Sequence, residues 1–136
     1  MVCFLAFRNV FILGFFFFSM PSCSNDDSKP FDETELKSLY KEIQKMADSQ
    51  TCEDSDFWSF TAFGSKPCGG PNSYIAYSTK IDVTLFLAKV EQYNSGVADY
   101  NRRNGIISDC AMVAKPTGLI CKEGKPVFTY SGNANY

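Results

Sequence analysis

Histidine is absent from this chain of 136 residues. Without imidazole, the chain cannot form a Ser-His or Cys-His nucleophile pair, and it has no histidine ligand for a metal. Its six cysteines also show no Cys-x-x-Cys spacing, the pattern typical of redox centres. We therefore expect no enzymatic activity and neither a metal nor another cofactor.

An excess of basic residues is also missing. The formal net charge is -2, and Arg8 is the one basic residue that precedes Cys23. Binding to phosphate backbones requires a basic patch, so we expect no nucleic-acid partner.

A long apolar run is the third absence. Residues 10–20 are apolar apart from a serine, but Pro21 follows them, and a membrane-spanning helix needs about 20 apolar residues. A short apolar run after a basic residue is typical of a secretory signal peptide. The sequence predicts a signal peptide over residues 1–22 and no permanent membrane span.

Cys23 follows Met20, Pro21 and Ser22, a segment that resembles the lipobox of bacterial lipoproteins. The resemblance implies that diacylglycerol is attached to the Cys23 sulfur, with acyl chains such as palmitate. The membrane would then be a partner through this anchor. Ordinary cleavage nearby, which would leave Cys23 as a structural cysteine, is the alternative.

Cysteine parity favours the anchor. Cys3 leaves with the signal peptide, and lipidation of Cys23 leaves an even number for disulfides in an oxidising compartment: Cys52, Cys68, Cys110 and Cys121. Four cysteines allow three pairings. A bond between Cys110 and Cys121 would close only a short hairpin, so we favour the two pairings that cross between the halves of the chain.

The mature chain divides into three parts. Residues 23–30 form a polar, acidic tether after the lipidated cysteine, residues 31–130 a single domain, and residues 131–136 a flexible tail. The tether resembles the acidic stretch that routes some lipoproteins to the cell surface, although a plain solvated linker has the same composition. We expect a monomer at the outer membrane or cell surface; the leaflet stays open.

The domain contains two amphipathic patterns. The first helix is predicted to begin after Asp32, with Glu35 completing a capping box, and to end near Ser49. The second runs over residues 82–104, from an Asp82 cap to a stop at Gly105. Strand patterns cover residues 57–63, 73–78, 110–114, 118–121 and 126–130. These elements predict an α+β fold, two amphipathic helices packed on a small antiparallel sheet and stapled by disulfides.

Part of the chain resembles a family of exported bacterial proteins without an assigned activity. The resemblance spans residues 52–125 and is most specific in KPCGGP at residues 66–71 and YIAYS at residues 74–78; it also includes Cys52, Tyr93, Asn94, Asn101, Ser108, Asp109, Cys110, Pro116 and Cys121. Family members carry two further cysteines, at the positions of Trp58 and Pro126. If those two cysteines form a disulfide with each other in the family, this chain lacks both partners of that one cross-link.

The loop over residues 64–71 is the candidate recognition segment. Adjacent Gly69 and Gly70 permit unusual backbone shapes that can bind an anion, and we expect Lys66 to be its exposed charge. Tyr74, Tyr77 or Trp58 would be aromatic neighbours. A tight turn anchored by a disulfide is the plainer interpretation.

The leading functional hypothesis is a non-catalytic lipoprotein that binds a protein or glycan partner, or has a structural role, in the envelope. One alternative is an inhibitor of an extracellular hydrolase acting through Lys66, Pro67 and Cys68. Another is a hydrolase that uses carboxylates, for which the candidates are Asp54, Asp56, Asp82, Asp99 and Asp109.

Overall fold

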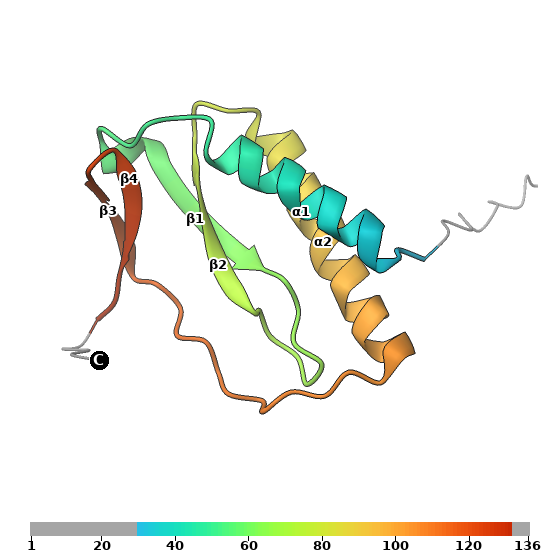
Figure 1. The fold of residues 1–136 in the computed structure, drawn as a ribbon. Coiled ribbons are helices and arrows are strands. Elements are labelled where there is room, and N and C mark those ends of the chain that lie inside the picture. Colours follow the sequence, from blue (N-terminus) through green and yellow to red (C-terminus); the bar gives the residue numbers. More distant parts are fainter. Residues whose placement is uncertain (1–29, 132–136) are drawn as a thin grey trace, which may run out of the picture.

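The computed structural model describes residues 30–131, so the predicted signal peptide, Cys23, nearly all of the tether and residues 132–136 lie outside it. The elements are α1 (Glu33–Ala47), η1 (Ser55–Phe57), β1 (Trp58–Phe63), β2 (Ser73–Ser78), α2 (Val83–Asn104), β3 (Gly118–Lys122) and β4 (Lys125–Thr129). The α+β class is confirmed (Figure 1). Neither described helix is long and apolar enough to span a membrane.

The start of α1 has the predicted capping box. The Asp32 carboxylate accepts a hydrogen bond from the Glu35 N–H, and the Glu35 carboxylate accepts one from the Asp32 N–H, both at 2.9 Å. The helix ends at Ala47, slightly earlier than the expected end near Ser49. Local side-chain chemistry therefore sets where this helix begins.

Both ends of α2 are also where the sequence places them. Asp82 accepts a hydrogen bond from the Leu85 N–H at 2.9 Å, and Gly105 ends the helix in the left-handed conformation with φ of 60°. Gly96, in the middle of α2, is buried against α1: a Cβ there would lie 2.9 Å from the Leu36 side chain. The glycine permits the close approach of the two helices.

The strands form two separate antiparallel hairpins instead of one sheet. β1 pairs with β2, with Trp58 opposite Ser78, and β3 pairs with β4, with Cys121 opposite Pro126. Figure 1 shows three layers, in which the helices cover one side of the β1–β2 hairpin and the β3–β4 hairpin lies on the other. Phe60 on β1 links the hairpins through edge contacts with the rings of Tyr74 and Phe128.

The prediction of a strand over residues 110–114 is wrong. This stretch belongs to a non-helical segment, residues 106–117, that we call the strap, and Cys110 within it has φ of 56°. The N–H of Cys110 bonds to the Ser108 hydroxyl, and that of Ala111 bonds to the Asp109 carboxylate. Local side chains thus satisfy the N–H groups that a strand would pair with a neighbour.

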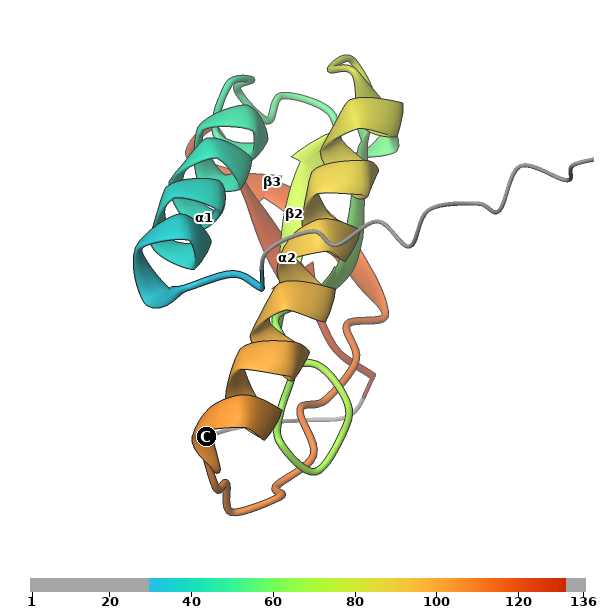
Figure 2. The same cartoon turned by 90° about the vertical axis from the view of Figure 1, so that its right-hand side faces the viewer.

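The hydrophobic core lies between the helices and the β1–β2 hairpin (Figures 1 and 2). Its buried residues are Leu39, Ile43, Ala47, Phe63, Ile75, Tyr77, Phe86 and Val90. Ile43 and Phe86 are fully buried and come from the facing sides of the two helices. The helical periodicity of the sequence therefore identifies the buried faces correctly.

Two disulfides connect the layers. Cys52 pairs with Cys121 and Cys68 pairs with Cys110, which is one of the two pairings favoured from the sequence. The first bond ties the segment after α1 to β3. The second ties the loop over residues 64–72 to the strap, and Figure 2 shows the two segments side by side near the C-terminal end of α2.

Candidate functional site

The loop over residues 64–72, which contains the predicted recognition segment at residues 64–71, is fastened to α2 by two asparagines. The Asn94 side-chain oxygen accepts a hydrogen bond from the Gly64 N–H at 2.7 Å, and the Asn101 amide donates to the Ser65 carbonyl at 2.8 Å. These two asparagines lie two helical turns apart, so one face of α2 positions the start of the loop.

Lys66 is not the exposed charge that the sequence predicts. Its side chain is only 16% exposed, because the ammonium donates to the Ala111 carbonyl and lies 3.7 Å from the Asp109 carboxylate. Both partners belong to the strap. Lys66 therefore holds the strap against the loop and does not project as the inhibitor hypothesis requires.

Gly69 and Gly70 do occupy the conformations that the sequence predicts, with φ of 93° and 81°. The Gly69 N–H donates to the Lys66 carbonyl, and the Gly70 carbonyl accepts from the Lys66 N–H. The loop therefore uses these backbone groups in its own turn, and the Gly69 N–H is occupied instead of facing an anion.

A groove of about 660 Å³ is lined by residues of both the loop and the strap. Lys66, Gly69, Gly70 and Tyr74 line it, which brings four of the predicted recognition residues together. Tyr77 is not among them: it is buried in the core, with its ring 4.8 Å from that of Phe86. Tyr74 and Tyr77 are three positions apart on β2, so their side chains point to opposite faces of the strand. The sequence alone does not say which of the two faces is buried.

The contact between Lys66 and the strap predicts how Asp109 titrates. The Ala111 N–H and, secondly, the Lys66 charge lower the Asp109 pKa below its ordinary value of 3.8. A lowered folded-state pKa stabilises the fold above the ordinary value, and this contribution is lost as pH falls through the lowered one. Lys66→Met should raise the Asp109 pKa part of the way back, as measured by carboxyl NMR. Lys122→Met is the control, and equal Asp109 pKa values in both variants would contradict the contact.

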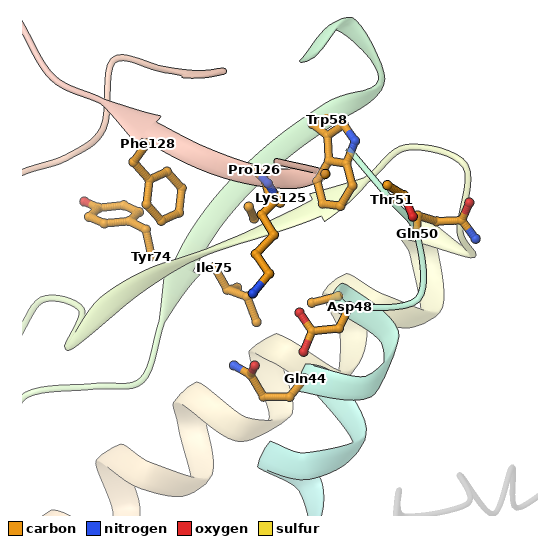
Figure 3. A pocket seen from close by; sticks show the side chains of 13 residues that line it. Gln44, Asp48, Gln50, Thr51, Trp58, Tyr74, Ile75, Lys125, Pro126 and Phe128 are labelled. Carbon is orange, nitrogen blue, oxygen red and sulfur yellow. The ribbon is translucent and has the colours of Figure 1, made fainter. Parts of the chain in front are cut away.

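A second cavity, missed by the sequence, lies between the C-terminal end of α1 and the two hairpins (Figure 3). We call it the α1–hairpin pocket. Its volume is about 470 Å³, and its lining is Gln44, Ala47, Asp48, Gln50, Thr51, Trp58, Tyr74, Ile75, Ala76, Gly124, Lys125, Pro126 and Phe128. Trp58, which the sequence analysis names as a possible aromatic neighbour of the recognition loop, is largely buried and borders this pocket.

Polar side chains from two different elements meet in the α1–hairpin pocket. Figure 3 shows the Lys125 side chain extending from β4 across Ile75 toward Asp48 and Gln44 at the end of α1. Within residues 30–131, the side chains of these three polar residues make no hydrogen bond or ion pair. Their hydrogen-bonding capacity is therefore available to a ligand.

The backbone around the pocket is fixed. The Cys52 N–H donates to the Gly124 carbonyl at 2.8 Å, and Cys52 is bonded to Cys121 on the neighbouring strand. Glu123 and Gly124 form the β3–β4 turn with φ of 53° and 76°. The turn, the disulfide and the end of α1 thus hold the pocket walls together without a ligand.

Among the described residues, four of the five carboxylates that were considered for hydrolysis have structural partners, and Asp56 is the exception. Asp54 and Asp82 cap η1 and α2, and Asp99 pairs with Arg103 and Arg102, which lower its pKa. A general acid needs a raised pKa, so the lowered pKa values of Asp99 and Asp109 are opposite to that requirement. No cluster of ligands suited to a metal ion occurs within the described part of the chain.

Comparison of the chain with protein-family models, curated proteins and solved structures finds no match. Trp58 and Pro126, where the resembling family carries extra cysteines, line the same pocket.

Proposed function

We propose that this chain is an exported lipoprotein, anchored through acyl chains on Cys23, whose domain binds a partner in the cell envelope without catalysis. The observation that carries the binding role is the α1–hairpin pocket, where unpaired polar side chains converge next to the apolar side chains of Ile75 and Trp58. Pockets of this kind, with a few convergent polar groups, are the usual form of ligand sites.

The position of the pocket suits a protein that is tethered by its N-terminal side. The tether enters the domain at the start of α1, at Glu33, whereas the pocket lies beside Ala47 and Asp48 at the other end. At 1.5 Å per residue, the 15 residues of α1 separate the two by about 22 Å. An anchor on Cys23 would hold the domain at the outer membrane or cell surface and leave this end accessible to a partner.

The pocket chemistry favours binding over catalysis. Its lining contains a single carboxylate, Asp48, and no serine, cysteine or histidine. Glycoside hydrolysis by the usual route requires two carboxylates that flank the scissile bond. The lining residues suit recognition of a ligand that leaves unchanged.

Replacement of Cys23 by serine tests the anchor. The full chain, produced in a bacterial host with an outer membrane, should sediment with membranes and carry acyl mass, because several acyl chains bind a bilayer stably. Cys23→Ser should lack the acyl mass and appear in the soluble fraction. Mass spectrometry and membrane fractionation measure both effects.

Cys3→Ser is the matched control, since Cys3 lies in the predicted signal peptide and should not affect the mature protein. If Cys23→Ser stays as membrane-bound as the control, with unchanged mass, the lipoprotein proposal is wrong.

A further inference from the structure

The charges around the α1–hairpin pocket restrict what it can bind. Asp48 and Lys125 bring one negative and one positive group to the same cavity, and the C-terminal end of α1 adds a partial negative charge. A phosphate or another strong anion would therefore meet repulsion as well as attraction. The pocket suits a ligand without net charge.

The apolar floor and the polar groups face the cavity together. Ile75 and Trp58 supply apolar surface, and Asp48, Gln44 and Lys125 supply a carboxylate, an amide and an ammonium group (Figure 3). A purely apolar ligand would bury these groups without hydrogen bonds, which is unfavourable. The ligand should thus carry both hydrogen-bonding groups and an apolar face.

A sugar ring has this division, because its C–H groups form an apolar face and its hydroxyls lie around the edge. An acetamido group adds an N–H for the Asp48 carboxylate, a carbonyl for the Lys125 ammonium, and a methyl group for the apolar floor. The volume of about 470 Å³ falls within the range of roughly 300–1,000 Å³ typical of small-molecule sites.

We propose that the α1–hairpin pocket binds an N-acetylated amino sugar, with Asp48, Gln44 and Lys125 bonding its polar groups over Ile75, and with Trp58 at the border of the site. This inference rests on the proposed binding function and adds the chemical class of the ligand. Because the disulfide and the β3–β4 turn fix the walls beforehand, binding requires little ordering of the protein.

The chain itself contains the reporter for the test. Trp58 is its single tryptophan and borders the pocket, so tryptophan fluorescence follows this site alone. The full lipidated chain in detergent micelles is titrated with N-acetylglucosamine, its trimer chitotriose, cellotriose, which carries a hydroxyl in place of each acetamido group, and trialanine. We expect saturable fluorescence changes with both acetylated sugars. Cellotriose should bind at least about tenfold more weakly than chitotriose.

Variants assign the binding to the named residues. Asp48→Asn and Lys125→Met should each weaken chitotriose binding by roughly tenfold or more, since each removes a hydrogen bond to a charged group. Lys45→Met, which alters an exposed lysine on α1 outside this pocket, should bind as the parent does. Melting temperatures of all three show whether the fold is intact.

Four outcomes would overturn the inference: no saturation with chitotriose, equal binding of cellotriose, tighter binding of trialanine, or full binding by folded Asp48→Asn and Lys125→Met. The recovered trimer is also weighed by mass spectrometry. If chitotriose is cleaved, the non-catalytic proposal is wrong but the ligand class stands. If the trimer stays intact and does not bind, the ligand class is wrong but the Cys23 anchor stands.

Discussion

The double variant Cys52→Ala/Cys121→Ala is expected to lose about 4 kcal/mol of unfolding free energy. The disulfide spans a sequence separation of 69, and the loop-closure entropy that it removes from the unfolded chain corresponds to about that amount. Small domains are stabilised by only about 5–15 kcal/mol in total, so this bond contributes a large share of the margin. Urea denaturation of the variant and the parent measures the difference.

The second disulfide provides the comparison. Cys68 and Cys110 are separated by 42 residues and both are exposed, whereas Cys52 is buried. Cys68→Ala/Cys110→Ala should cost a similar chain-entropy amount, and its structural effect should be confined to the loop and strap. Only the Cys52 pair should also disturb the fluorescence of Trp58. Two alkylatable thiols among these four cysteines in the folded parent would contradict one of the bonds, and four would contradict both.

The sequence predicts the helices well because their signals are local. Asp32 and Glu35 bond to each other's backbone within one turn, and Asp82 and Gly105 act on adjacent backbone groups. Such interactions need no knowledge of the rest of the fold. The apolar periodicity then identifies the buried faces, which is why the α+β class could be predicted.

The functional surfaces depend on contacts between distant segments, which the sequence does not specify. Lys66 looks exposed among glycines and prolines, yet its partners are in the strap, beyond α2. The α1–hairpin pocket likewise needs Asp48, which follows α1, and Lys125 of β4 to face one cavity. Neither residue belongs to a recognisable motif, so composition alone gave no signal for the pocket.

Phe86→Ala should remove about 3–5 kcal/mol of unfolding free energy, the usual cost of truncating a buried phenylalanine. Phe86 is fully buried, and its ring contacts the Tyr77 ring at 4.8 Å. Tyr77 and Ile75 lie on the same face of β2 because side chains alternate along a strand. The cavity would therefore lie under the strand that contributes Ile75 to the floor of the α1–hairpin pocket.

Leu85→Ala is the matched control, since Leu85 precedes Phe86 on α2 but is 47% exposed. Its truncation should cost less than about 1 kcal/mol, because it removes little buried surface. Chemical denaturation, with Trp58 fluorescence as the probe, compares the two variants. Equal destabilisation would contradict the burial of Phe86. A large loss in Phe86→Ala, accompanied by weaker chitotriose binding in the fraction that remains folded, would show that the core between α2 and β2 supports the pocket floor.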